Sequence, residues 1–322
     1  MTHFLRLLTT LSMGMFFIGC GVVDLVKCLP ISKSESKKNE EISLPWILIS
    51  GPDGHVQHKV FIFKDEGFPK PPVLLLHELP GLNPKTLAYA NDLKRDFTVY
   101  VPLLFGKENE ESTSSGLWNY FFSGEWSEKE EWIAYDYQDG RIETKKASTR
   151  PITHWLRKVV GWIEEEHPEQ SIGVIGMCLT GGIPLALLDN SQIRALVVAQ
   201  PTLPFMFWST EYDKRDLSLS NEELFNAQTR VKNDGVLIYG TRFEDDCIAR
   251  KEKFDRMKDM FGTHFLDGQI EKKEYKVKNK PNAHSTLIGE YVENQPGNPS
   301  EKKRNDILQF LKKILYSKNI TK

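Results

Sequence analysis

The stretch from Ser171 to Gly182 constrains the fold more than any other part of the sequence. An apolar run ends there in small residues around a single cysteine, Cys178, and a helix-forming run from Ile183 to Leu188 follows. Gly176 and Thr180 flank the cysteine two positions away on either side, where a sharp turn with a strained backbone needs small side chains. This pattern predicts a strand, a tight turn and a helix, with sulfur exposed at the turn as in a nucleophile elbow.

A cysteine at such a turn lies at the N-terminus of the next helix, where the macrodipole favours a thiolate. Thr180 is larger than the glycine usual at its position, but Gly181 and Gly182 follow directly. The alternative interpretation is a buried structural cysteine beside a glycine-rich helix start. The elbow alone does not separate the two interpretations, so the remaining motifs matter.

The length and composition indicate one large globular domain. The chain has 322 residues, of which 40% are hydrophobic and 27% are charged, which is enough for a sizeable core. The formal net charge of −2 does not indicate a nucleic-acid partner. Charged runs at 271–274 and 301–304 are interpreted as solvated faces.

The first 19 residues are predicted to be a targeting segment. Residues 1–6 carry one arginine and no acid, and 7–19 are apolar but short for a membrane span. The stretch Phe17-Ile18-Gly19-Cys20 resembles a bacterial lipoprotein signal, which implies cleavage before Cys20 and a lipid on its sulfur. The alternatives are an ordinary signal peptide or an uncleaved anchor. Residues 20–44 are interpreted as a flexible tether, so we expect an exported protein anchored by lipid to a bacterial membrane.

The four cysteines leave little room for disulfides or metal sites. If Cys20 carries lipid and Cys178 is a nucleophile, only Cys28 and Cys247 remain to pair. Because Cys28 lies in the predicted tether, we expect no disulfide. No cluster of cysteine and histidine has zinc spacing, and neither a metal nor a cofactor is expected.

Residues 45–318 read as an α/β domain. A hairpin is followed by alternating strands and helices, which predicts a mostly parallel sheet covered on both faces. The expected strands are 46–50, 56–64, 73–76, 97–104, the run before Cys178, 193–199, 235–239 and 270–277. The expected helices are 84–94, 152–166, 183–188, 248–261 and 301–315. Two aromatic-rich segments, 107–149 and 204–230, are predicted insertions that form a lid or pocket wall, or else packed surface loops.

Four polar stretches follow predicted strands, and the C-terminal ends of parallel strands meet at one edge of a sheet. They are 77–81, Cys178, 244–246 and 282–285. A cysteine nucleophile needs a base, and a catalytic histidine needs an acid to orient it. His284, directly after the last predicted strand, is the candidate base, whereas we expect its rival His77 to be structural.

The chain from about Val73 to Leu315 resembles the dienelactone hydrolase family of α/β-hydrolases. The matching motifs are His77-Glu78-Leu79-Pro80-Gly81, the elbow Gly176 to Gly182, the acid after Tyr239-Gly240, and Ala283-His284-Ser285. The resemblance implies an α/β-hydrolase fold and a Cys-His-Asp triad that acts on esters or lactones. It also implies that Glu78 lies near the resting thiol and that the amides of Leu79 and Leu179 form an oxyanion hole.

The acid remains open among Glu244, Asp245 and Asp246. We choose Asp246 because Phe254, eight residues later, fits the helix pattern that follows the acid in similar sequences, and we keep Asp245 in reserve.

Two arginines are weaker candidates for the site. Arg150 precedes a helix as an arginine does in similar chains, and Arg242 lies near the acid. Either could hold a substrate carboxylate, or each could form a surface ion pair.

These features predict a hydrolase of small ester, lactone or thioester bonds that works through an acyl-enzyme on Cys178. The alternative is a ligand-binding lipoprotein that keeps the hydrolase fold without turnover.

Overall fold

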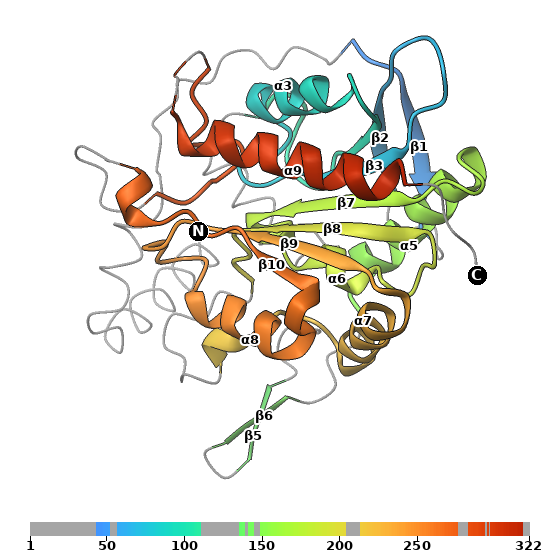
Figure 1. The fold of residues 1–322 in the computed structure, drawn as a ribbon. Helices are drawn as coiled ribbons and strands as arrows, with labels where there is room; N and C mark the ends of the chain where they lie inside the picture. The colour runs from blue at the N-terminus through green and yellow to red at the C-terminus, as the bar shows by residue number, and fades with distance from the viewer. Residues whose placement is uncertain are drawn as a thin grey trace, which may run out of the picture.

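A sheet of eight strands forms the centre of the domain (Figure 1). Its spatial order is β1-β2-β4-β3-β7-β8-β9-β10. The first two strand pairings, β1 with β2 and β2 with β4, are antiparallel, and all other neighbours are parallel. The strands are β1 (Trp46–Ser50), β2 (Gln57–Phe63), β3 (Pro72–Leu76), β4 (Thr98–Pro102), β7 (Ile172–Met177), β8 (Ile193–Ala199), β9 (Leu237–Thr241) and β10 (Phe265–Asp267).

The structure is a computed structural model, and it describes most of the predicted domain. Residues 43–51, 57–110, 149–203, 213–275, 283–293, 295 and 297–317 are described, together with the strands β5 (Tyr135–Gln138) and β6 (Arg141–Thr144). The predicted signal peptide, nearly all of the tether and large parts of both predicted insertions lie outside these residues.

The central strands are buried on both faces because their sequences are continuously apolar. All five residues of β3 and all six of β7 are buried. Side chains alternate between two cores, with Leu74 and Leu76 in one and Val73 and Leu75 in the other. Full burial of each such side chain contributes about 1.5–3 kcal/mol.

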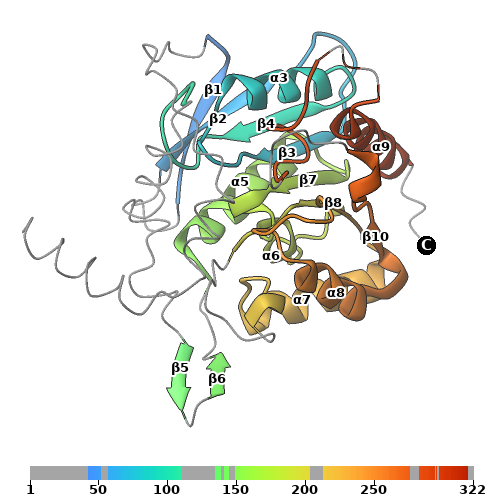
Figure 2. The same cartoon turned by 90° about the vertical axis from the view of Figure 1, so that its left-hand side faces the viewer.

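Helices cover both faces of the sheet. α3 (Pro84–Leu93) and α9 (Pro299–Leu315) pack on one face, while α5 (Pro151–Glu166), α6 (Ile183–Ala186), α7 (Asn221–Asp234) and α8 (Lys251–Phe261) pack on the other (Figure 1). Figure 2 shows the strands crossing the domain from β1 to β10 between these two layers. Among the described helices, none is long and apolar enough to cross a membrane.

Two expected elements differ in the structure. The expected strand 270–277 is wrong over its described part, 270–275: the last strand among the described residues is β10, and Lys272–Glu274 forms a short 3-10 helix. Residues 271–274 are exposed and charged, so they favour a solvated turn over a buried strand. The expected insertion 204–230 contains the first ten residues of α7, which begins at a capping box between Ser220 and Glu223.

Close packing at the end of β7 explains the small residues around Cys178. A Cβ on Gly176 would lie 2.3 Å from the carbonyl oxygen of Thr180 and 2.7 Å from Cδ of Pro184. A Cβ on Gly181 would lie 2.7 Å from Cα of Pro201. These contacts are with backbone or ring atoms that cannot move aside, so the turn requires glycine at both positions.

We predict opposite effects for two glycine-to-alanine substitutions. Gly176→Ala should lower the free energy of unfolding by about 1–3 kcal/mol or more, because the added methyl overpacks a rigid turn. Gly161→Ala, on α5 with nothing within 4 Å of the added methyl, should raise it by about 0.5–1 kcal/mol through helix propensity. Urea denaturation followed by circular dichroism measures both, and equal effects would contradict the packing argument.

Candidate active site

Cys178 lies directly after β7 in a left-handed backbone conformation, with φ of 53°. A non-glycine residue in this region costs about 1–3 kcal/mol and persists only where its surroundings hold it. The helix after the turn is shorter than expected, because a three-residue 3-10 helix precedes the four-residue α6. The expected contribution of a helix macrodipole to the thiolate is therefore small, and other groups must stabilise the sulfur.

Thr180 ties the turn to the neighbouring strand. Its Oγ1 accepts a hydrogen bond from the backbone N–H of Met177 at 3.0 Å. The same hydroxyl lies 3.1 Å from the carbonyl oxygen of Leu76 and 3.2 Å from that of His77, to which it donates. Thr180 thus connects β7 to the end of β3, which accounts for a residue larger than glycine at this position.

His284 and Asp246 form a buried pair. Nδ1 of His284 lies 2.7 Å from Oδ2 of Asp246. The other carboxylate oxygen, Oδ1, accepts hydrogen bonds from the amides of Ile248 and Ala249, both at 2.9 Å. Asp246 is only 3% exposed, so both of its oxygens are held by protein donors. This arrangement fixes the proton of the imidazole on Nδ1 and leaves Nε2 as the basic atom.

The neighbouring acids point elsewhere. Asp245 accepts a hydrogen bond from the hydroxyl of Tyr275, and its carboxylate lies 3.3 Å from Nζ of Lys272. Glu244 accepts from the backbone N–H of Lys272 at 2.6 Å. Of the three candidate acids, Asp246 is therefore the one that contacts His284.

The surroundings of His284 favour its protonated form. Burial on its own lowers the pKa of His284, but the charges of Asp246 and of the Cys178 thiolate outweigh it and raise that pKa well above 6.5. Nε2 is buried and makes no aligned hydrogen bond within the described residues. A poorly aligned contact between base and nucleophile is common before substrate binds. The structure therefore brings Cys178, His284 and Asp246 together.

Arg242 does not face the site, contrary to its candidacy as a substrate-binding residue. It is 2% exposed, and it donates to the carbonyls of Ala249 at 2.9 Å, Glu244 at 3.0 Å and Asp246 at 3.2 Å. A fourth bond goes to the side chain of Gln269 at 2.6 Å. Through these bonds Arg242 stabilises the conformation of the loop that carries Asp246. The alternative of a surface ion pair is also wrong, because the guanidinium is buried.

The same loop contains a disulfide. Cys247, next to Asp246, is disulfide-bonded, so the expectation of no disulfide is wrong. Cys178 is the free cysteine of the described residues. Pairing depends on which cysteines meet in space, and spacing along the chain does not reveal that.

Glu78 is buried, but it binds residues other than the thiol. Its Oε2 accepts from Nε2 of Gln200 at 3.0 Å, and its Oε1 accepts from the hydroxyl of Ser285. Burial raises the pKa of Glu78, against the opposing effects of Ser285, His284 and Gln200. Among the described residues no hydrogen bond joins Glu78 to Cys178, and the carboxylate is linked to the loop of His284 through Ser285. The expected position of Glu78 near the resting thiol stays a prediction.

His77 has a structural environment. Its Nε2 accepts the backbone N–H of Leu104 at 3.0 Å, and its Nδ1 lies 3.2 Å from the carbonyl oxygen of Glu78. Burial lowers the pKa of His77 to about 4. The neutral ring therefore connects β4 to the loop after β3 rather than serving as a base.

The amides expected to form the oxyanion hole are available. Leu79 and Leu179 pack in the same core cluster as Cys178. In the part of the chain that the structure describes, neither backbone N–H donates a hydrogen bond. Two unpaired amides beside a nucleophile are what a developing oxyanion needs.

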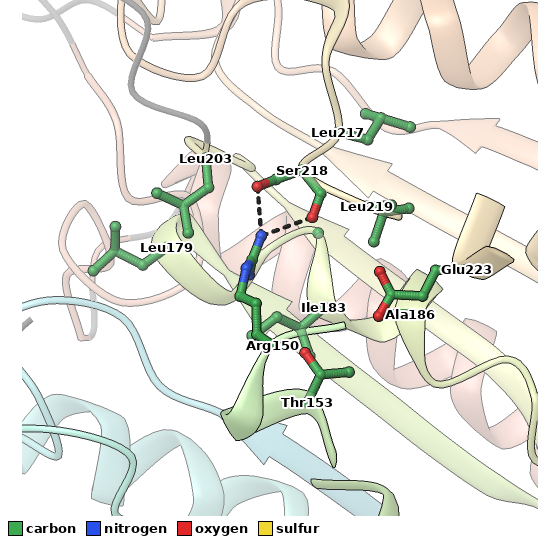
Figure 3. Close-up of a pocket in the computed structure, with 11 residues that line it drawn as sticks. Arg150, Thr153, Leu179, Ile183, Ala186, Leu203, Leu217, Ser218, Leu219 and Glu223 are labelled. Atoms are coloured by element: carbon green, nitrogen blue, oxygen red, sulfur yellow. Dashed lines mark hydrogen bonds between the residues drawn. The ribbon is translucent and has the colours of Figure 1, made fainter. Parts of the chain in front are cut away.

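A narrow hollow lies beside Leu179 (Figure 3). Arg150 reaches into it and donates to the carbonyl oxygen of Ser218 at 2.7 Å and to the Ser218 hydroxyl. In Figure 3 the guanidinium points toward Ser218, and Leu203 and Leu219 are drawn on either side of it. Arg150 is thus the one of the two candidate arginines that lies close to the elbow.

Sequence reasoning missed a buried lysine, Lys253, that binds two segments lining this hollow. Nζ of Lys253, on α8, donates to the carbonyl oxygen of Leu203 at 2.8 Å and to that of Asp216. Burial lowers the pKa of Lys253 to about 7. Lys253 holds together the two segments that carry the lining residues Leu203 and Leu217. The charged composition of α8 concealed it, although Lys253 lies at helical spacing with the buried Met257 and Phe261.

The loop after β8 was also missed. Gln200 bridges Glu78 and Thr286, and Oγ1 of Thr202 lies 3.7 Å from Sγ of Cys178. Its position after a parallel strand was the available signal, since β8 ends at the same edge of the sheet as β7. No cluster of His, Cys, Asp and Glu side chains within the described ranges could hold a metal ion.

Solved structures share this architecture. A proposed dienelactone hydrolase from Klebsiella pneumoniae matches with a TM-score of 0.51 and 13% identity, covering 84% of this chain and 98% of that one. A dienelactone hydrolase-like promiscuous phosphotriesterase from metagenomic libraries matches with a TM-score of 0.50 and 15% identity, covering 84% and 98%. An acylaminoacyl peptidase from Pyrococcus horikoshii matches with a TM-score of 0.50 and 13% identity, covering 87% of this chain and 43% of the peptidase.

The chain has the α/β-hydrolase fold. The predicted fold class is confirmed, with the site at the C-terminal edge of the parallel strands of this hydrolase fold. At these identities the likeness establishes architecture and not activity. Comparison with models of protein families finds no match, and comparison with curated protein sequences finds none either.

We predict that Asp246→Asn lowers the pKa of His284, because burial then acts without the opposing charge of Asp246. NMR titration of the His284 ring protons measures this pKa, and Asp245→Asn serves as the matched control that leaves it unchanged. A raised folded-state pKa also means that the charge of His284 stabilises the native protein below pH about 6.5. That stabilisation is lost as the pH rises through the folded-state pKa. A shift with Asp245→Asn and none with Asp246→Asn would contradict the assignment.

Proposed function

We propose that the protein is a thiol-dependent hydrolase of small ester, lactone or thioester bonds, with Cys178, His284 and Asp246 as its catalytic triad. The observation that carries this proposal is the buried pair of Asp246 and Nδ1 of His284, in which the charge of Cys178 also acts on His284. A structural cysteine needs no such base. The unpaired amides of Leu79 and Leu179 add the group that an acyl-transfer site requires.

The reaction follows from these positions. The Cys178 thiolate attacks the carbonyl carbon of the substrate, and the negative charge that develops on oxygen is held by the two amides. His284 then gives its proton from Nε2 to the leaving alcohol or thiol as the carbon–oxygen or carbon–sulfur bond breaks. Water, losing a proton to Nε2, attacks the resulting thioester and releases the carboxylic acid and the thiolate. Asp246 stabilises the imidazolium in both halves.

The substrate class rests on weaker support. The names of two structural neighbours concern a lactone hydrolase and a phosphotriesterase, and at 13% and 15% identity they suggest only that the fold accommodates such chemistry. Arg150 is the candidate contact for an anionic substrate group, because it lies in the hollow beside Leu179. It would have to release Ser218 to do so.

We predict that the purified protein hydrolyses short chromogenic esters and that Cys178→Ala abolishes this activity, since no other group described at the elbow can form the acyl-enzyme. Iodoacetamide treatment should have the same effect as the substitution. Cys178→Ser tests whether the triad activates oxygen as well as sulfur. Full turnover by Cys178→Ala would refute the mechanism. Binding of an ester without any turnover by the unmodified protein would favour the ligand-binding alternative.

We also propose that the protein is exported and anchored by a lipid on Cys20. The support is the sequence of residues 1–20 alone, which lies outside the described residues. A tether of this kind places the hydrolase domain close to a membrane surface without a spanning helix.

For this anchor we predict that the mature protein begins at a diacylated Cys20 and that Cys20→Ala moves it from the membrane fraction or leaves the precursor uncut. Mass spectrometry of the N-terminal peptide and membrane fractionation measure this. An unmodified N-terminus at another residue would exclude the anchor and leave the hydrolase proposal intact.

A further inference from the structure

Thr202 contacts the candidate nucleophile twice. Its backbone N–H donates to the carbonyl oxygen of Cys178 at 3.0 Å, and its Oγ1 lies 3.7 Å from Sγ. Thr202 is 1% exposed, so its hydroxyl is cut off from solvent. Within the residues that the structure describes, sulfur is the one hydrogen-bond partner of that hydroxyl. Buried hydroxyls are rarely left unpaired, which makes this contact part of the architecture.

The position of Thr202 is fixed by its own loop. Gln200, two residues earlier, has a left-handed φ of 33°, and its amide donates to the carbonyl of Thr241 at 2.7 Å. Pro201 packs against the elbow so closely that a Cβ on Gly181 would lie 2.7 Å from its Cα. These contacts fix the backbone of Thr202 against the elbow, and from that position its hydroxyl lies beside the sulfur.

The direction of the bond depends on the charge of the sulfur. A neutral thiol can donate or accept, whereas a thiolate can only accept. A hydroxyl that donates to an anion forms a charge-assisted bond, which is stronger than its neutral counterpart. The charged group that faces the sulfur is His284, with Asp246 behind it. Because the helix after the elbow is short, its macrodipole stabilises a thiolate only weakly, and a further hydrogen-bond donor adds to that stabilisation.

We propose that the Thr202 hydroxyl donates a hydrogen bond to the sulfur of Cys178 when it is a thiolate and, together with His284, stabilises that anion. The role of this hydrogen bond in catalysis rests on the proposed hydrolase function, whereas the existence of the bond does not. Thr202 touches the reacting atom, so it is a catalytic residue in that scheme. The bond also lowers the reactivity of each thiolate, because a stabilised anion is a weaker nucleophile.

The test is the pH dependence of alkylation at Cys178. Thr202→Val keeps the shape of the side chain and removes the hydroxyl, whereas Thr202→Ser keeps the hydroxyl. Iodoacetamide labelling of the Cys178 peptide, followed by mass spectrometry across the range in which thiols ionise, gives the thiol pKa and the plateau rate of the thiolate. Thr241→Val is the matched control, since that buried hydroxyl has no hydrogen-bond partner among the described residues.

We predict that Thr202→Val raises the thiol pKa by about one unit, which is about tenfold less thiolate at low pH. The plateau rate at high pH should rise about threefold, because nucleophilicity increases with thiol pKa with a Brønsted slope of about 0.4–0.5. Thr202→Ser and Thr241→Val should match the unmodified protein. A merely structural role would not raise the pKa and the plateau together.

An unchanged thiol pKa in Thr202→Val would overturn the proposal. A lowered thiol pKa would overturn it too, because it would mean that the hydroxyl accepts a hydrogen bond from the neutral thiol. Thermal melting checks that Thr202→Val is folded. If it is not folded, Thr202→Ala takes its place, because the smaller alanine relieves any misfit of the valine. Ester turnover is measured separately. A shift in pKa without turnover would refute the hydrolase proposal and leave this one standing, whereas turnover without the shift would do the reverse.

Discussion

Residue 176 has no room for a side chain, because a Cβ there would stand 2.3 Å from the carbonyl oxygen of Thr180. Because Gly176 has no side chain, the chain can reverse direction directly after β7, where Cys178 adopts a positive φ. The hydroxyl of Thr180 then joins the turn to the end of β3. The strain at one residue is therefore sustained by packing on two strands, and the sulfur gains a fixed position.

The loop that carries Asp246 is held in place by the buried guanidinium of Arg242. Removing the Arg242 guanidinium from water costs several kcal/mol of free energy. Its four hydrogen bonds offset that cost because all four acceptors lie within hydrogen-bond distance at once. Three of those acceptors are carbonyl oxygens around Asp246. The loop is consequently rigid where it must present one carboxylate oxygen to His284 and the other to two amides.

Local sequence patterns were reliable where they coincided with burial on both faces. The runs of β3 and β7 are apolar without interruption, and β8 is apolar apart from Arg194, so their assignment needed no knowledge of their neighbours. The pattern failed at 270–277, where one buried residue, Ile270, stands among charged ones and makes only an isolated bridge. It also failed at 221–234, where a capping box was hidden in a segment read as an insertion.

The sequence by itself determined most of the strands and helices, the elbow around Cys178 and a short set of candidate groups, because these depend on residues that are neighbours along the chain. Only the tertiary structure decided which group meets which. Asp245 and Asp246 are adjacent, and the path of their loop sends one carboxylate to Tyr275 and the other to His284. The disulfide at Cys247, the burial of Arg242 and the contact of Thr202 with the sulfur were settled in the same way. The contacts of Asp246 with His284 and of Thr202 with the sulfur join segments far apart in sequence, and their meeting is set by how the sheet and its loops pack.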